Sequence, residues 1–169
     1  KHYFYLEFDQ KVFQADTVTM GKNNAIYAKF GDKARKVCAR YGISYISVEQ
    51  AKRNLRKEIN SFNETTLIPL ARKAWNDVLG KIRVEGGSED QKTTFYTALY
   101  RSSERMINIS EDGKYFSGFD GRIHDDGCVD FWTDDWIWDT YRALHPLQIL
   151  LNPKAESQKL TSYLRVYEQ

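Results

Sequence analysis

The chain has 169 residues and a mass of 19.8 kDa, enough for one domain with a hydrophobic core or for parts of two. Apolar residues make up 41% and aromatic residues 14%, which excludes disorder as the main state. The 25 basic and 23 acidic residues nearly cancel, so the net charge gives no support to nucleic acid as a partner. No stretch approaches the roughly 20 apolar residues of a membrane span, and the first residues lack the pattern of a signal peptide.

Charge is unevenly distributed along the chain. Residues 33–83 hold twelve basic and four acidic side chains, whereas residues 111–139 hold two basic and nine acidic ones, which suggests two structural regions. Two cysteines, Cys38 and Cys128, lie in these separate regions and form one disulfide or none. Because the chain opens on Lys1 rather than Met, we expect a segment of a longer protein.

Strands are expected in the first 46 residues, which are rich in aromatic and β-branched side chains. Turn-forming residues separate them. The expected ranges are 2–8, 12–19, 25–30 and 35–46. Strands without a partner sheet are typical of the end of a larger β structure, although three of them could pair and pack against the helices that follow.

The pattern becomes helical at Ser47, where Ser47 and Gln50 fit a capping box. A second helix is expected over residues 66–81, and the basic outer faces of both helices are interpreted as solvated. Its expected buried face contains Leu67, Leu70, Ala71, Ala74, Trp75, Val78 and Leu79.

Further helices are expected after the break at Gly86-Gly87-Ser88. Their expected ranges are 92–103, 134–151 and from about 156 onward, the last still helical at Gln169. Residues 106–133 carry no helical period and are expected to form a loop that is functional or part of a larger structure. Pro146 lies within the range 134–151 and is expected to kink that helix.

The segment FWTDDWIWDTYRALHPL, residues 131–147, is the strongest candidate for chemistry. At helical spacing Asp135, Asp139 and Arg142 share one stripe, with Trp138 beside it. Carboxylate and guanidinium groups next to an indole suit sugar recognition, because they pair with vicinal hydroxyls while the ring covers the apolar sugar face. The alternative is a salt bridge between Asp139 and Arg142, with the tryptophans in the core.

Other candidate motifs are weaker. We interpret His145 as a packing residue, and the acidic loop that contains Asp120, Asp125, Asp126 and Asp130 does not fit the EF-hand calcium pattern. Motifs of serine hydrolases, dinucleotide enzymes, P-loop NTPases and zinc peptidases are absent from the sequence.

The runs TTFYTALYR, GKYFSGFDGRIH and FWTDDWIWDTYRALHPL, in this order, resemble glycoside hydrolase family 92, the calcium-dependent exo-acting α-mannosidases. Upstream, GISYISVEQAKRNLRKEI and WNDVLGKIRVEG are similar to the linker of that family. The resemblance implies an α+β chain with N-terminal antiparallel strands followed by helices, a fragment of a β-sandwich plus (α/α)6-barrel enzyme. It implies residues 1–46 as terminal strands of the sandwich, 47–87 as linker helices and 88–169 as the first barrel helices.

The family reaction is inverting hydrolysis of terminal α-mannosides, which uses an acid and a base carboxylate. The resemblance places both carboxylates and the calcium ligands outside this chain, so we expect no catalytic residue here, an unknown metal site and an inactive isolated fragment. Asp139 matches the family aspartate that contacts mannose. The expected substrate-binding residues are Asp139, Trp138, Arg142, Trp132 and Asp135.

The resemblance implies a mannose-containing glycan such as an N-glycan as partner, a bacterial source and a secreted or periplasmic parent protein. The linkage stays open, with α-1,2 as the leading expectation. A non-catalytic carbohydrate-binding module and a structural module remain the alternatives. We also expect the fragment to expose apolar surface and to self-associate.

Overall fold

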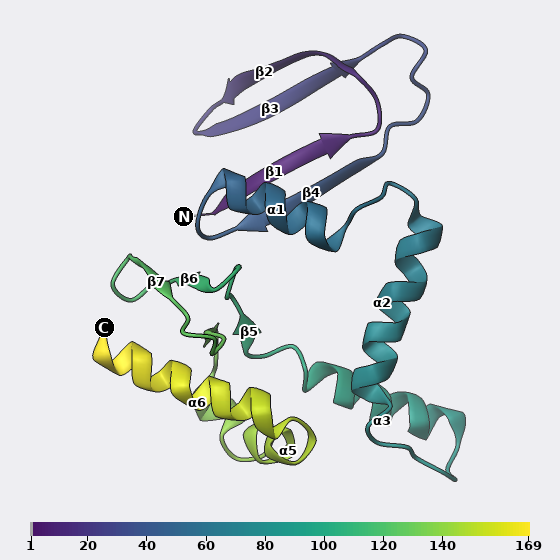
Figure 1. Cartoon of the computed structure of the whole chain (residues 1–169). Coiled ribbons are helices and arrows are strands. Elements are labelled where there is room, and N and C mark those ends of the chain that lie inside the picture. The colour runs from purple at the N-terminus through teal and green to yellow at the C-terminus, as the bar shows by residue number, and fades with distance from the viewer. Residues whose placement is uncertain (1) are drawn as a thin grey trace. The chain divides into compact units, whose positions relative to one another are not determined.

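A computed structural model describes residues 2–169 (Figure 1). The strands are β1 (Tyr3–Phe8), β2 (Val12–Met20), β3 (Asn23–Phe30), β4 (Ala39–Ser44), β5 (Ile107–Asn108), β6 (Lys114–Phe116), β7 (Ile123–Asp125) and β8 (Trp132–Thr133). The helices are α1 (Val48–Glu58), α2 (Glu64–Leu79), α3 (Glu89–Arg101), α4 (Ile137–Thr140), α5 (Leu144–Leu151) and α6 (Pro153–Glu168). Antiparallel strands precede the helices, which confirms the predicted α+β class.

The chain forms two compact units, one up to Leu67 and one from Ile68 onward. In the first unit β1 pairs with β4, β2 pairs with β3, and both pairs are antiparallel. Helix α1 packs on β1 and β4, as Figure 1 shows. This packing extends the first unit beyond residue 46, the predicted end of the strands.

The core of the first unit forms where α1 lies on β4. Ala51 is fully buried, and Leu55 is 1% exposed. Gly42 permits this close approach, because a Cβ atom there would lie 2.3 Å from the Ala51 carbonyl oxygen. Ser47 begins the helix by accepting a hydrogen bond from the Gln50 N–H at 3.1 Å, as its sequence predicts.

The last predicted strand is shorter than expected. It occupies Ala39–Ser44 rather than residues 35–46, because the preceding segment is held in irregular structure. The Ala34 N–H donates to the Gly31 carbonyl at 2.8 Å, which closes a turn. The Cys38 N–H donates to the Asp9 carboxylate, also at 2.8 Å, so these backbone groups do not join the ladder.

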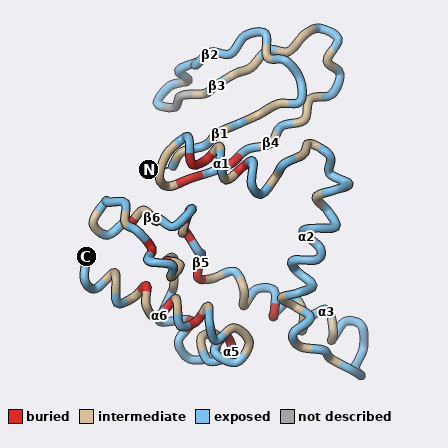
Figure 2. The backbone as a smooth tube through the Cα atoms, viewed as in Figure 1, coloured by how far each residue is buried: buried red, intermediate tan, exposed pale blue. Residues whose placement is uncertain are grey.

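Helix α2 corrects one packing prediction. It forms close to the expected range, but no residue of α2 is buried, and Figure 2 shows it in the colours of exposed and intermediate residues. Leu70 is 64% and Trp75 is 40% exposed, although both belong to the predicted buried face. The apolar stripe is real, but the described residues cover it only in part, with the Trp75 and Tyr100 ring centroids 4.6 Å apart.

In the second unit, helix α3 begins at Ser88, which forms a complete capping box with Gln91. The stretch expected to be a loop contains the short pairs β5–β8 and β6–β7. Tyr115 and Phe131, 2% and 1% exposed, stack with ring centroids 4.0 Å apart and form the centre of this core. Their packing fixes a stretch that no periodicity predicted.

The predicted helix over residues 134–151 is wrong as a single element. Asp134 has a φ of 65°, a left-handed conformation that an α-helix cannot contain. The chain instead forms the short α4, a turn and then α5. Pro146 does not kink a long helix, because it lies in the first turn of α5, where an N–H is not needed.

Two further observations concern the described chain. Among residues 2–169 no helix has the length and apolar character required to cross a bilayer.

Cys38 and Cys128 are both free thiols. The sequence left open one disulfide or none, and the structure has none between these two cysteines.

Candidate functional site

The exposed α4 group consists of Trp138, Asp139, Tyr141 and Arg142, on α4 and the turn that follows it. Trp138 is 76% and Tyr141 is 46% exposed, values far above those of a packed aromatic residue. The two rings lie with their centroids 6.1 Å apart. The alternative that places Trp136 and Trp138 in the core is therefore wrong for both, since Trp136 is 59% exposed as well.

Arg142 packs on the aromatic rings of this group. Its Nε donates to Tyr141 Oη at 2.7 Å, and its guanidinium lies 5.2 Å from the Tyr141 ring centroid and 5.8 Å from that of Trp138. These contacts are cation–π interactions. The alternative of a salt bridge between Asp139 and Arg142 is wrong, because the Asp139 carboxylate has no partner in the part of the chain that the structure describes.

Asp135 lies apart from this group, which corrects the prediction of a shared helical stripe. It precedes α4, and its side chain is only 3% exposed. Its Oδ1 accepts from Thr140 Oγ1 at 2.9 Å, and its Oδ2 contacts His145 Nε2 at 2.9 Å and the Tyr163 hydroxyl. Protein donors thus occupy the carboxylate that was expected to face a sugar.

The protonation states around Asp135 follow from these contacts. Burial by itself raises the pKa of Asp135, but hydrogen bonds from Tyr163, His145 and Thr140 outweigh burial and hold that pKa below its ordinary value. Burial, together with the adjacent carboxylate, raises the pKa of Tyr163. Asp135 is therefore an anion at neutral pH, and Tyr163 is a neutral hydroxyl that donates to it.

A buried ionic cluster surrounds this carboxylate. We define it as Asp135, His145, Glu156, Lys159 and Tyr163. His145 Nδ1 contacts Glu156 Oε1, and Lys159 Nζ lies 3.2 Å from Glu156 Oε2. Glu156, Lys159 and Tyr163 share one face of α6, a spacing in the sequence that could have revealed the cluster. None of these three residues was predicted from the sequence, and His145, predicted as a packing residue, is a member of the cluster.

Trp132 lies on β8 against α6 and is half-buried. Its backbone N–H donates to Ser162 Oγ at 2.9 Å, and its Nε1 donates to Gln158 Oε1 at 3.4 Å. Lys159 Nζ lies 5.5 Å from its ring centroid. These contacts with α6 hold Trp132 in the fold, and no contact with the exposed α4 group is among them.

The acidic loop does not form a metal site. Asp120 accepts from the Arg122 N–H at 2.9 Å and contacts His124 at 2.9 Å, and Asp126 accepts from the Cys128 N–H at 2.8 Å. Within residues 2–169 no group of three or more His, Cys, Asp and Glu residues is placed to hold a metal ion. The described residues therefore present no side-chain cluster that fits a calcium ion, whose sites need six to eight oxygen ligands.

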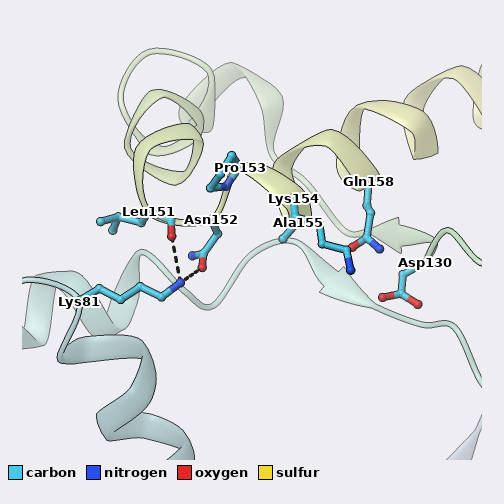
Figure 3. A pocket seen from close by; sticks show the side chains of 8 residues that line it. All are labelled: Lys81, Asp130, Leu151, Asn152, Pro153, Lys154, Ala155 and Gln158. Atoms are coloured by element: carbon cyan, nitrogen blue, oxygen red, sulfur yellow. Dashed lines mark hydrogen bonds between the residues drawn. The ribbon is translucent and has the colours of Figure 1, made fainter.

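A pocket of about 450 Å³ lies where α5 meets α6 (Figure 3). Lys81 Nζ donates to the Leu151 carbonyl at 2.9 Å and to Asn152 Oδ1, and Figure 3 draws both bonds. The lysine therefore binds one backbone carbonyl and one side-chain oxygen at the junction where α5 ends and α6 begins. The remaining side chains of the lining belong to Asp130, Pro153, Lys154, Ala155 and Gln158.

The exposed α4 group presents three kinds of contact to one ligand. The free carboxylate of Asp139 accepts hydrogen bonds, the guanidinium of Arg142 donates them, and the indole of Trp138 offers an apolar face. A sugar ring carries vicinal hydroxyls and an apolar face, so this combination suits a carbohydrate.

Comparison with known proteins identifies the family. The profile described as "Glycosyl hydrolase family 92 catalytic domain" matches residues 50–169, and thus more than half of the chain. The chain belongs to glycosyl hydrolase family 92. This confirms the resemblance that the sequence motifs indicate, and the matched range contains every candidate substrate-binding residue.

Similar proteins of this family have been solved. A family GH92 inverting mannosidase from Bacteroides thetaiotaomicron has 31% sequence identity and a TM-score of 0.85, covering 99% of this chain and 25% of its own. A family GH92 α-mannosidase from the same organism has 23% sequence identity and a TM-score of 0.85, and the match covers 99% of this chain and 25% of the mannosidase. At this identity the match supports a shared fold and nothing further. The family 92 chain therefore spans about a quarter of the solved structures it resembles.

A curated relative gives a further match. It is an uncharacterized secreted glycosidase from Arthroderma benhamiae, 31% identical over a region that covers 53% of this chain and 13% of that protein.

Proposed function

We propose that this family 92 chain is part of an exo-acting, inverting α-mannosidase that removes terminal α-linked mannose from glycans, N-glycans included, with α-1,2 linkages preferred. The observation that carries this proposal is the exposed, unpartnered carboxylate of Asp139 beside Trp138 and Arg142. Family membership supports glycoside hydrolysis. The neighbour with 31% identity is named an inverting mannosidase, which supports both the sugar and the stereochemistry.

In this proposal the exposed α4 group binds the mannose and performs no bond cleavage. Asp139 accepts hydrogen bonds from two adjacent hydroxyls, and the Trp138 indole covers the apolar face of the ring. Arg142 holds the two aromatic rings through its contacts with Tyr141 and Trp138. Such contacts accelerate the reaction when they are stronger in the distorted transition state than in the ground state.

We place the general acid and the general base outside residues 1–169. Inverting hydrolysis needs two carboxyl groups roughly 6.5 to 9.5 Å apart with a water between them. Asp135 and Glu156 do not suit these roles, because they are buried in ion pairs and hydrogen bonds with the protein. We accordingly propose that the isolated chain is inactive, and that the calcium implied by the resemblance is also held elsewhere.

The name of the curated relative supports a secreted parent protein, and we propose secretion or export to the periplasm. We propose a mannose-containing glycan as the partner, which the neighbour named a mannosidase supports. The apolar faces left exposed on this chain lead us to propose self-association when it is isolated.

The test uses the full-length protein that carries this chain, with α-1,2-, α-1,3- and α-1,6-mannobiose as substrates. We expect hydrolysis of the α-linked disaccharides, fastest for α-1,2, with β-mannose as the first anomer seen by proton NMR. Release of α-mannose first would overturn inversion. Mannose binding without hydrolysis of any linkage would show a carbohydrate-binding module instead.

A further inference from the structure

His145 connects two buried carboxylates from separate parts of the second unit. Its Nε2 lies 2.9 Å from Asp135 Oδ2, just before α4, and its Nδ1 contacts Glu156 Oε1 on α6. The exposed fractions of the three side chains are 14%, 3% and 4%. Solvent therefore contributes little to the stabilisation of either carboxylate.

The hydrogen-bond geometry determines the state of the imidazole ring. A neutral imidazole has one donor and one acceptor nitrogen, whereas an imidazolium has two donors. Both nitrogens of His145 face carboxylate oxygens, which accept and do not donate when ionised. The ring that satisfies both contacts is the imidazolium. Together with Lys159, 3.2 Å from Glu156, it gives the buried ionic cluster two cations for two anions.

The buried ionic cluster anchors the segment 135–140, which carries the proposed sugar-binding side chains. Asp135 lies at its start, and Thr140, which donates to Asp135 at 2.9 Å, is the last residue of α4. Trp138 and Asp139 lie between these two anchored residues. Helix α4 has only four residues and no side-chain cap, so its own hydrogen bonds are too few to fix it.

We propose that His145 is a positioning residue for the mannose site: as an imidazolium it binds Asp135 and Glu156 together and so fixes the segment that presents Trp138 and Asp139. This inference rests on the proposed function. It assigns the positioning of the mannose-binding side chains to a residue that does not contact the sugar. A displacement of about 1 Å in a binding group is enough to cost about a hundredfold in rate.

The test measures kcat and KM on an α-mannoside, with mannose inhibition constants, for full-length wild type, His145→Gln and Glu156→Gln. Measurements are made well below each unfolding midpoint. A glutamine side chain has an amide that donates and a carbonyl that accepts, so it cannot donate to both carboxylates in the way an imidazolium does. We expect His145→Gln to lower kcat/KM by at least tenfold and to weaken mannose inhibition, and Glu156→Gln to do the same more mildly.

The double variant His145→Gln/Glu156→Gln provides a rescue. The amide introduced in place of His145 then donates to Asp135, and its carbonyl accepts from the amide introduced in place of Glu156, which restores a continuous set of hydrogen bonds. We expect the double variant to be more active than His145→Gln alone. A residue needed only for stability would lower the unfolding midpoint and leave the kinetics of the folded enzyme unchanged.

His124→Gln is the matched control. His124 also contacts an aspartate at 2.9 Å, but it binds one carboxylate, Asp120, within the β6–β7 region. We expect its kinetics to equal those of the wild type. If His145→Gln does not fold, Glu156→Gln carries the test, with the same expected loss of kcat/KM and weaker mannose inhibition.

The outcomes separate this inference from the proposed function. A wild type that hydrolyses no α-mannoside overturns the proposed function and the inference with it. A wild type that hydrolyses α-mannosides, combined with wild-type kinetics in His145→Gln and Glu156→Gln, overturns the inference alone.

Discussion

Arg142 donates a hydrogen bond from Nε to the hydroxyl of Tyr141 at 2.7 Å, and no ion pair joins it to Asp139, three residues earlier. At this spacing on a helix an aspartate and an arginine commonly pair. Here the short α4 ends at Thr140, so Arg142 lies outside the helix. The aromatic contacts of Arg142 leave the Asp139 carboxylate open to a ligand.

The free carboxylate gives the first prediction. Asp139→Asn in the full-length protein is expected to lower kcat/KM on α-mannosides by about a hundredfold or more, because charge-assisted hydrogen bonds to two hydroxyls are lost. The melting temperature should stay close to that of the wild type, since the carboxylate binds nothing in the described fold. Asp77→Asn, which removes a surface ion pair with Lys73 at 2.6 Å, is the control with unchanged kinetics. A lowered melting temperature with normal kcat/KM would contradict the sugar contact.

Trp138 gives the second prediction. Its ring is 76% exposed, so truncation removes little packing within this chain. Trp138→Ala is expected to raise KM for an α-mannoside about tenfold, as the apolar sugar face loses its cover, while the unfolding free energy changes by less than about 0.5 kcal/mol. Tyr167→Ala, at a position 90% exposed on α6, should change neither quantity. Equal KM values for the wild type and Trp138→Ala would exclude stacking on this ring.

The sequence predicted the elements whose signal is local. Ser47 caps α1 as expected, and the strands before it lie near their predicted ranges. Motif resemblance identified the family, and it selected Asp139 and Trp138, which the structure places together on the exposed α4 group. That these two residues bind the sugar stays a prediction.

Other features depend on contacts between distant residues and could not be predicted from periodicity. Asp134, at the start of the predicted helix, has a left-handed backbone conformation. Its carboxylate binds the guanidinium of Arg105, which lies 29 residues earlier in the sequence. Asp135 carries the right charge for a sugar contact, but its neighbours from α5 and α6 surround it. The exposed face of α2 shows the opposite error, since an apolar pattern predicts burial without identifying what covers it.

The packing of α1 on β4 gives the third prediction. A Cβ atom at Gly42 would lie 2.3 Å from the Ala51 carbonyl oxygen and 2.8 Å from Leu55 Cβ, and backbone atoms cannot move aside easily. Gly42→Ala should therefore lower the unfolding free energy of the first unit by about 1 to 3 kcal/mol or more in chemical denaturation. Gly118→Ala is the control, because no atom lies within 4 Å of its built Cβ. Equal stability of Gly42→Ala and the wild type would contradict the close approach of helix and strand.

The partly exposed apolar face of α2 gives the fourth prediction. Leu70 and Trp75 are 64% and 40% exposed, and Ile68 is 53% exposed on the same helix. The isolated chain is expected to gain mass with concentration in light scattering and to bind a hydrophobic dye. Replacing Leu70 and Trp75 by lysine should reduce both effects, whereas the exposed Lys73→Gln should not. A monomer at every concentration without dye binding would contradict the prediction.

The buried carboxylate of Asp135 gives the last prediction, which concerns acid stability. Its pKa is lowered in the folded chain, since hydrogen bonds from Tyr163, His145 and Thr140 outweigh burial. A lowered carboxyl pKa stabilises the folded state above the unfolded pKa of about 3.9, and this stability is lost as the pH falls through the folded value. Asp135→Asn should therefore be less stable than wild type at pH 7, by about 2 kcal/mol for charged hydrogen bonds lost in a buried site.

The difference in unfolding free energy between wild type and Asp135→Asn should shrink steadily below about pH 4, because protonation removes the same charge from the wild type. Denaturant titrations of the full chain between pH 7 and pH 3 measure this difference. Asp125→Asn is the control, since Asp125 is 83% exposed and its contact with Lys114 at 3.2 Å is a surface ion pair. A stability difference for Asp135→Asn that stays constant with pH would show that its carboxylate is not stabilised as an anion in the fold.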